Sequence, residues 1–371
     1  MRSKRRIGSL LEMQATLHRA IGVGSRPLIA LVLAFTISGL LILTQRVNPL
    51  TAFGAMLNGA VGSVGGLAAT GVRAIPLIFG GLSFALAFQA GLFNVGVEGQ
   101  LLVGAAAATT VAIQAWPIPG WLQMILAMLA AAFAGSLWAL IPAYLRAYRG
   151  ISEIVVTLML NFIAANFISY LVLDGPLRRP GAWFPQSPDL VQATWLPLLI
   201  PRTSLHAGII IAVALGILLY NLMKLTPFGF WVRMAGSNPD AAEYAGVNVK
   251  AYSLTIMLLA GSVAGLAGAS EIMGLRHALF ENFSGGLGYD GIAVGLLAAG
   301  NPLGVILAAL FFGALRAGAG LMQQTVGITT AMADVIQALT VFFVVGMGFA
   351  STPEEVGPEK PTAQKEELVK C

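Results

Sequence analysis

Charged residues, cysteine, histidine and nucleotide-binding motifs are scarce or missing in this sequence. Only 10% of its 371 residues are charged, whereas a soluble protein carries roughly 25%. The one cysteine, Cys371, excludes a disulfide within the chain. No G-x-x-x-x-G-K-[ST] sequence occurs, so the chain does not bind ATP through a P-loop. The three histidines, His18, His206 and His277, lie far apart without acidic neighbours at ligand spacing, so we expect no metal site. Together these absences exclude a soluble enzyme, a nucleic-acid-binding protein and a disulfide scaffold.

Apolar runs of membrane-spanning length fill most of the chain instead. Hydrophobic residues make up 57% of the sequence, and the mean hydropathy is +0.82. A helix of about 18 residues rises about 27 Å, close to the thickness of the bilayer core. The sequence therefore predicts an all-α, polytopic membrane protein with about ten transmembrane helices. We expect them at 27–44, 74–90, 99–116, 120–144, 152–173, 205–223, 251–274, 288–299 (a short one), 302–320 and 329–349.

The remaining segments have compositions that do not suit a span. Residues 46–73 are Gly-rich and only moderately apolar, which predicts an interfacial piece. Residues 174–204 contain six prolines and predict a long loop. Residues 350–371 are charged and contain proline, which predicts a disordered tail. The expected organisation is a basic N-terminus at 1–26, a transmembrane domain at 27–349 and this tail.

Lysine and arginine are distributed unevenly between the two predicted sides of the membrane. With ten crossings, roughly twice as many fall on the side of the N-terminus as on the other side. Because positive charge accumulates on the cytoplasmic side, we expect both termini to be cytoplasmic. The segment 224–250 is then cytoplasmic and the loop 174–204 extracytoplasmic. The connections at 91–98 and 300–301 carry no lysine or arginine, so re-entrant helices there remain possible.

A polar, glycine-flanked segment interrupts two apolar runs at GLFNVGVEGQLLVGA. It contains Asn94, Glu98 and Gln100. A carboxylate at membrane depth costs at least about 2.5 kcal/mol, and glycines there break or kink a helix. One interpretation is a helix break that lines a cavity inside the protein. The other is a short cytoplasmic loop with a solvated Glu98, and the sequence does not decide between them.

A second interruption, SGGLGYDGIAVGLLAAGNPLG, carries Asp290 and falls in the corresponding part of the other half of the chain. Paired interruptions of this kind predict a pathway built from a repeated unit. The pairs Gly261/Gly265 and Gly291/Gly295 predict close helix packing. Several polar residues on apolar spans can either face a channel or form hydrogen bonds between helices: Asn161, Asn166, Glu271, Asp334 and Gln337.

The most polar stretch between spans is KLTPFGFWVRMAGSNPDAAEYAGVNVKAYS, residues 224–253. Asn238-Pro239 predicts the start of a short helix, with asparagine as the cap and proline in the first helical position. Ala241, Ala242 and Gly246 give this helix a face of small residues. Such a helix is suited to contact with another protein, although an ordinary helical loop explains it equally well.

At this stretch the sequence resembles a known family. PFGFWVRMAGSNPDAAEYAGVNV is similar to the coupling loop of the inner-membrane permeases of ATP-binding-cassette (ABC) importers for ribose, branched-chain amino acids and nucleosides. GLFNVGVEGQLLVGA, GISEIVVTLMLNFIA and GYDGIAVGLLAAGNPLG resemble further motifs of the simple-sugar and nucleoside branch, in the same order. The Pro-rich loop and the length resemble the longer permease subunit of these importers, although Tyr289 stands where many relatives have Phe.

The resemblance implies a permease subunit that carries a nucleoside or simple sugar across the inner (plasma) membrane of a bacterium and performs no covalent chemistry. Its implied partners are a cytoplasmic ABC ATPase with tandem nucleotide-binding domains, a second permease and an extracytoplasmic solute-binding protein. No cofactor, metal or nucleic acid is implied. The expected ATPase contacts are Gly236, Asn238, Ala241, Ala242 and Gly246. The expected pathway residues are Phe93, Asn94, Glu98, Asn161 and Asp290.

A different class of transporter also fits the pattern. An ion-gradient-driven secondary transporter would use Glu98 and Asp290 as its coupling residues. Such a protein would transport solute without a partner ATPase.

Overall fold

The computed structural model describes residues 29–349, and the side chains among them up to residue 346. The chain divides into a main unit of residues 38–338 and a smaller unit whose described residues are 29–37 and 339–349. Within the described range the regular elements are helices, accompanied by two isolated β-bridges. The all-α prediction is thereby confirmed. The predicted basic terminus 1–26 and tail 350–371 lie outside the described residues.

The helices follow one another with short connections, except for one long loop. The first described helix is Ile29–Thr44. The others are α2 (Pro49–Val61), α3 (Val64–Gln89), α4 (Val97–Ala112), α5 (Gly120–Arg149), α6 (Glu153–Leu173), α7 (Gly208–Leu225), α8 (Pro227–Ser237), α9 (Pro239–Tyr244), α10 (Val249–Glu271), α11 (Leu287–Leu297), α12 (Pro302–Val326) and α13 (Ala331–Phe349). Between α6 and α7 only a 3₁₀ turn occurs, Gln192–Thr194, as the prolines of this loop predict.

Six described helices are long and apolar enough to cross a membrane: α3, α5, α6, α7, α12, and α10 together with the π-helical turn Ile272–Arg276. The helix Ile29–Thr44 and α2 add a seventh span if they count as one, although they are bent by 116°. The remaining apolar helices, α4, α11 and α13, are shorter. A multi-span helical protein is therefore confirmed, while ten full crossings and the cytoplasmic position of both termini remain predictions.

The segment 46–73 differs from its prediction. Its last ten residues form the first part of α3, which begins at Val64 and not near residue 74. Ser63 caps this helix by accepting a hydrogen bond from the Gly66 N–H at 3.0 Å. The glycines that suggested an interfacial piece instead allow close contact with neighbouring backbone, since a Cβ on Gly59 would lie 3.1 Å from the Gly318 backbone.

Close packing through glycine joins α10 to α5 and α11 to α3. A Cβ on Gly261 would lie 2.5 Å from Ala139 Cβ and from the Gly135 carbonyl oxygen, and a Cβ on Gly291 would lie 2.7 Å from Gly80 Cα. No side chain larger than hydrogen fits at these points without a shift of the helices. The predicted packing role of the pairs Gly261/Gly265 and Gly291/Gly295 is confirmed.

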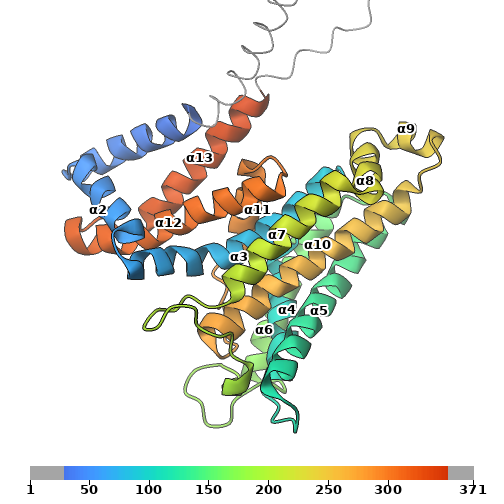
Figure 1. Cartoon of the computed structure of the whole chain (residues 1–371), viewed down its shortest axis with the longest axis horizontal. Coiled ribbons are helices and arrows are strands. Elements are labelled where there is room, and N and C mark those ends of the chain that lie inside the picture. The colour runs from blue at the N-terminus through green and yellow to red at the C-terminus, as the bar shows by residue number, and fades with distance from the viewer. Residues whose placement is uncertain (1–28, 350–371) are drawn as a thin grey trace, which may run out of the picture. The chain divides into compact units, whose positions relative to one another are not determined.

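The two most polar parts of the main unit lie at opposite ends of its long helices (Figure 1). Helices α8 and α9 are at one end of α7, and the loop 174–207 is at the other. Because α7 has 18 residues, it separates the two by about 27 Å. These two regions therefore face opposite sides of a membrane that α7 spans.

The glycine contacts predict a difference between two otherwise similar substitutions. Gly265→Ala places a methyl group against the Ala131 carbonyl and 3.3 Å from Gly135 Cα, whereas Gly320→Ala in α12 meets nothing within 4 Å. Overpacking costs about 1–3 kcal/mol, while an alanine without contacts gains helix propensity. We expect Gly265→Ala to lower the thermal unfolding midpoint of the purified chain and Gly320→Ala to keep or raise it. Equal midpoints for the two variants would contradict the packing role.

Candidate functional site at the paired helix breaks

The first break lies between α3 and α4, where residues 90–96 turn back into the helical bundle. Asn94 is fully buried. Its side-chain amide and that of Gln100 exchange two hydrogen bonds of 3.0 and 3.1 Å. The Asn94 side chain also accepts a hydrogen bond from the Gly96 N–H at 3.0 Å. These bonds give hydrogen-bond partners to polar groups at the helix break. Polar groups buried inside a membrane protein need such partners.

The second break lies between α10 and α11. The π-helical turn ends at His277, which has a left-handed φ of 58°. Residues 277–286 then lead back to the start of α11, and Gly286 adopts a φ of 89° directly before Leu287. Only glycine adopts such angles without a steric cost. Each half of the chain thus contains a long helix, a non-helical return segment and a shorter helix.

Glu98 joins the two breaks. Its carboxylate accepts a hydrogen bond from Ser284 Oγ at 2.5 Å and from the Gly288 N–H, in the first turn of α11, at 2.6 Å. Only 6% of the Glu98 surface is exposed. A carboxylate at the N-terminus of a helix is also favoured by the helix dipole. The alternative of a short loop with a solvated Glu98 is therefore wrong.

Asn161 and Phe93 connect the first break to α6. The Asn161 side chain accepts a hydrogen bond from the Gly99 N–H and donates one to the Val95 carbonyl, both at 2.9 Å, and contacts the Tyr289 hydroxyl at 3.3 Å. The Phe93 N–H donates to a carboxylate oxygen of Glu153 at 3.2 Å. Both residues anchor the break. The sequence left open whether Asn161 faces a channel or forms hydrogen bonds between helices, and the structure shows such hydrogen bonds.

Asp290 belongs to a network of charged residues on α11, α12 and α13. Its carboxylate lies 2.7 Å from Arg316 and accepts a hydrogen bond of 2.9 Å from Gln337. Arg316 also contacts Asp334 at 3.2 Å. The side chains of Asp290 and Arg316 are only 18% and 20% exposed, so their interaction is only weakly screened by solvent. This network holds the three helices together beside the second break.

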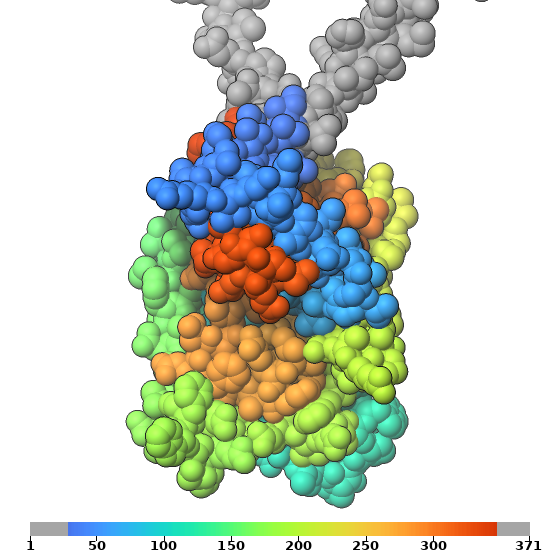
Figure 2. Space-filling view, turned by 90° about the vertical axis from the view of Figure 1, so that its left-hand side faces the viewer, coloured from blue at the N-terminus to red at the C-terminus, as the bar shows by residue number. Residues whose placement is uncertain are grey.

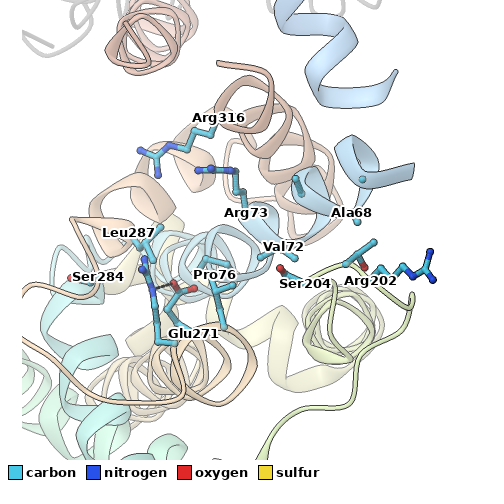
Figure 3. A pocket seen from close by; sticks show the side chains of 15 residues that line it. Ala68, Val72, Arg73, Pro76, Arg202, Ser204, Glu271, Ser284, Leu287 and Arg316 are labelled. Atoms are coloured by element: carbon cyan, nitrogen blue, oxygen red, sulfur yellow. Dashed lines mark hydrogen bonds and ion pairs between the residues drawn. The ribbon is translucent and has the colours of Figure 1, made fainter. Parts of the chain in front are cut away.

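A cavity of about 620 Å³ opens next to these breaks, and its walls come from α3, α10, α11, α12 and the loop around residue 203. Ser284 and Leu287 form the part that borders the Glu98 junction. Figure 3 shows Arg73 and Arg316 directed towards the same space, with Glu271 on another wall. Glu271 pairs with Arg276 at 3.0 Å. The cavity is therefore polar and extends from the loop 174–207 to the meeting point of the two helix breaks.

None of the residues that the sequence predicted for a pathway lines this cavity. Phe93, Asn94, Glu98, Asn161 and Asp290 are absent from its wall, although Glu98 and Asp290 contact the wall residues Ser284 and Arg316. The charged wall residues are Arg73, Arg202, Glu271, Arg276 and Arg316. Of these five residues, only Glu271 was among the polar residues considered from the sequence. Arg73 and Arg276 lie next to apolar spans, and this position is the signal that could have identified them.

The five expected ATPase-contact residues do not share one exposed face. Gly236 packs against the turn at residues 89–91, because a Cβ there would lie 2.7 Å from Gly91 N. Ala242 is fully buried beside Ala235 and Val247. The other three, Asn238, Ala241 and Gly246, are exposed. Asn238 caps α9 by accepting a hydrogen bond from the Ala241 N–H at 3.0 Å, and Pro239 is its first residue, so the predicted helix start is confirmed.

The loop 174–207 is tied to the second break. The Ser187 N–H donates to the Leu279 carbonyl at 2.7 Å, and the Leu190 N–H donates to the His277 carbonyl at 2.9 Å. Figure 2 shows the surfaces of the two segments side by side on one face of the main unit. A force on this loop would therefore act directly on the segment that leads to α11.

Two histidines lie close to this contact, His206 near the end of the loop and His277 at the start of the second return segment. Burial, and to a smaller extent the charge of His277, lowers the pKa of His206 to about 4, and burial also lowers the pKa of His277. The His277 ring stacks on Trp195 with a centroid distance of 3.8 Å. Among residues 29–349 no three His, Cys, Asp or Glu side chains come together as metal ligands.

The Glu98 junction predicts an order of stability for two variants. Glu98→Leu leaves the buried Gly288 N–H and Ser284 hydroxyl without an acceptor, at a cost of about 1–3 kcal/mol for each unpaired group. Glu98→Gln loses the charge and keeps one acceptor oxygen for the Gly288 N–H, while its NH2 group can donate to the Ser284 hydroxyl oxygen. In thermal unfolding of the purified chain, we expect the midpoint to fall for Glu98→Gln and to fall further for Glu98→Leu. A Glu98→Leu midpoint at the wild-type value would show that the carboxylate does not support α11.

Because His206 is buried, we expect acid to loosen the loop 174–207. The fold favours the neutral imidazole, so its contribution is complete above pH 6.5 and is lost as the pH falls from 6.5 towards 4. Hydrogen–deuterium exchange of residues 186–207, corrected for intrinsic rates, should increase between pH 7 and pH 5. His206→Gln, which does not titrate, should reduce this increase. The same pH dependence in the variant would assign the effect to another group.

Comparisons with known proteins agree with this architecture. Residues 66–345 match the family described as the branched-chain amino acid transport system / permease component. The chain is 38% identical over 333 residues to the glucose ABC transporter permease protein of Haloferax volcanii, with 87% of each chain covered. It is 36% identical over 328 residues to the guanosine ABC transporter permease protein of Bacillus subtilis, covering 86% of this chain and 92% of the relative.

A third relative, the nucleoside ABC transporter permease protein of Lactococcus lactis, is 32% identical over 328 residues, covering 86% of this chain and 89% of the relative. No solved structure matches the chain at a comparable level of significance.

Proposed function

Because the chain belongs to the permease family of branched-chain amino acid transport systems, we propose that its solute is a nucleoside or a simple sugar. The chain is a membrane transport subunit of an ABC importer and not an enzyme. The relatives named for glucose, guanosine and nucleosides support this choice of solute. A bacterial plasma membrane is its expected location.

One structural observation carries the proposal of a pathway in this chain. The polar cavity extends from the outer loop, at Thr203, to Ser284 and Leu287 beside the Glu98 junction. Membrane transporters commonly place their solute sites where broken helices meet inside the bundle. The cavity is then the outward-facing part of the pathway, and the residues around Glu98 form its inner boundary.

The two polar ends of the main unit fit two partners. The exposed residues of α9 and Gly246 contact a cytoplasmic ATPase, and the loop 174–207 receives an extracytoplasmic solute-binding protein. Gly236 contributes indirectly, because it links α8 to the turn that precedes the first break. A movement of α9 driven by ATP would reach Asn94 and Glu98 through this contact. Tandem nucleotide-binding domains in the ATPase and a second permease subunit complete the proposed importer.

An ion-gradient-driven mechanism has less support. Glu98 is held by two hydrogen bonds and Asp290 by Arg316 and Gln337. Both proposed coupling carboxylates are thus engaged in contacts within the protein. Binding of a proton or a sodium ion at either one would have to break these contacts.

Reconstitution tests the proposed function. The chain is placed in proteoliposomes with its ATPase, second permease and binding protein, and uptake of labelled guanosine and glucose is measured. We expect ATP-dependent uptake of at least one of them, and no uptake by the chain alone under a proton or sodium gradient. Gradient-driven uptake by the chain alone would overturn the proposal in favour of a secondary transporter.

In the same assay, Gly246 tests the proposed ATPase contact. A side chain at Gly246 meets nothing within 4 Å inside the chain, so Gly246→Arg should insert normally while its bulk blocks the partner. Gly246 has a φ of 83°, which asparagine tolerates better than most residues, so Gly246→Asn is the control. We expect Gly246→Arg to lose ATP-driven uptake and Gly246→Asn to retain most of it. Normal uptake by Gly246→Arg would show that Gly246 does not contact the ATPase.

A further inference from the structure

The charges around the cavity cancel. The arginines Arg73, Arg276 and Arg316 are matched in number by three carboxylates of the same region, Glu271, Asp290 and Asp334. Arg276 pairs with Glu271, and Arg316 contacts both aspartates. A fourth arginine, Arg202, is at the rim, and Figure 3 shows its guanidinium directed away from the other labelled side chains. The formal charges of these six residues therefore sum to zero, and Arg73 is the member whose charge no carboxylate of the described residues contacts.

The wall nevertheless has unused hydrogen-bonding capacity. The Arg73 side chain makes no hydrogen bond or ion pair with another residue of the described range 29–349, and Arg316 Nε is buried without a hydrogen-bond partner there. Glu271 uses one carboxylate oxygen for Arg276 and offers the other as an acceptor. Several guanidinium donors beside a carboxylate acceptor match hydroxyl groups, which both donate and accept.

The cavity lacks the group that recognises a nucleobase best. Among the described residues that line it, none is aromatic. Its apolar wall consists of small or aliphatic side chains such as Ala68, Val72 and Leu287. Aromatic rings are the usual stacking partners of a planar base, and here only the guanidinium groups of the arginines offer a flat surface. The wall therefore has more hydrogen-bonding groups for hydroxyls than flat surfaces for a base.

We infer that this cavity binds the neutral, hydroxyl-bearing ring of the solute, through Arg73, Arg316 Nε and the Glu271–Arg276 pair, and leaves a nucleobase without specific contacts. The inference rests on the proposed function and identifies which part of the solute is recognised. Glucose and guanosine, the solutes named for two relatives, share a hydroxylated ring and little else. The volume of about 620 Å³ is typical of small-molecule pockets.

Protection of an introduced cysteine tests the site directly. Ser204→Cys at the mouth of the cavity is made in the full-length chain with Cys371→Ser, and the chain is placed in nanodiscs. The rate of alkylation by a neutral maleimide is measured with increasing ribose, ribose 5-phosphate or adenine. Gln192→Cys, on the same loop but outside the cavity wall, is the control. We expect ribose to slow alkylation at position 204 in a saturable way, and to have no effect at position 192.

A second substitution assigns the protection to the proposed donors. Loss of a hydrogen bond from a charged group corresponds to roughly a tenfold weakening or more. Arg73→Gln should therefore raise the ribose concentration for half-protection about tenfold. Arg178→Gln, the same change on the exposed part of the loop, should leave it unchanged.

The remaining outcomes overturn the inference in distinct ways. Protection by ribose 5-phosphate at much lower concentration than ribose would indicate an anion site, and protection by adenine alone would indicate base recognition. Ribose protection that Arg73→Gln does not alter would place the ring elsewhere. No protection by any of these ligands, in a chain that still supports ATP-driven uptake with its partners, would reject the site and leave the proposed function intact. Failure of uptake itself would reject the proposed function.

Discussion

Backbone amides inside a membrane protein must find acceptors within the protein, because the lipid offers none. Two of the helices in this chain begin inside the bundle, and each leaves N–H groups of its first turn without a helical partner. Glu98, in the first turn of α4, accepts the Gly288 N–H in the first turn of α11. One buried carboxylate thus supports both half-helices. Gly288 fits this position because any side chain there would collide with the Glu98 backbone.

This constraint explains the arrangement around it. Asn161 fixes the same first turn by accepting the Gly99 N–H, and the Asn94–Gln100 pair fills the polar space of the first return segment. The second return segment is held from outside by backbone hydrogen bonds to the loop 174–207. The Glu98 junction therefore connects the loop 174–207 to the turn at residues 89–91. Gly236 of α8 packs against this turn. A permease that passes motion from a cytoplasmic partner to a solute site requires such a mechanical connection.

Local chemistry made some features predictable from the sequence. The Asn238-Pro239 helix start depends on two adjacent residues, and the loop 174–207 on closely spaced prolines. The glycine pairs on α10 and α11 were recognisable because their spacing places both on one helix face. The cavity wall was not predictable in this way. Arg73 and Arg316 are far apart in the sequence, and each alone resembles a charge that orients a helix. Only the packing of α3 against α12 brings them to the same cavity.

The prediction of where α3 begins was wrong for a related reason. Glycine lowers helix propensity, so a Gly-rich stretch suggests an interfacial segment, yet in a packed membrane bundle the same glycines allow helices to approach closely. The choice between the two depends on neighbours such as Gly318 that the local sequence does not reveal.

The junction between the half-helices is tested most directly by amide exchange at Gly288. The full-length chain in nanodiscs is exposed to deuterated buffer, and exchange is followed in fragments that cover residues 284–291. The account predicts that the Gly288 amide exchanges slowly in the wild-type chain, because its N–H is buried and bonded to Glu98. Exchange at the rate of an unprotected amide would contradict it, since α11 would then begin without the support of α4.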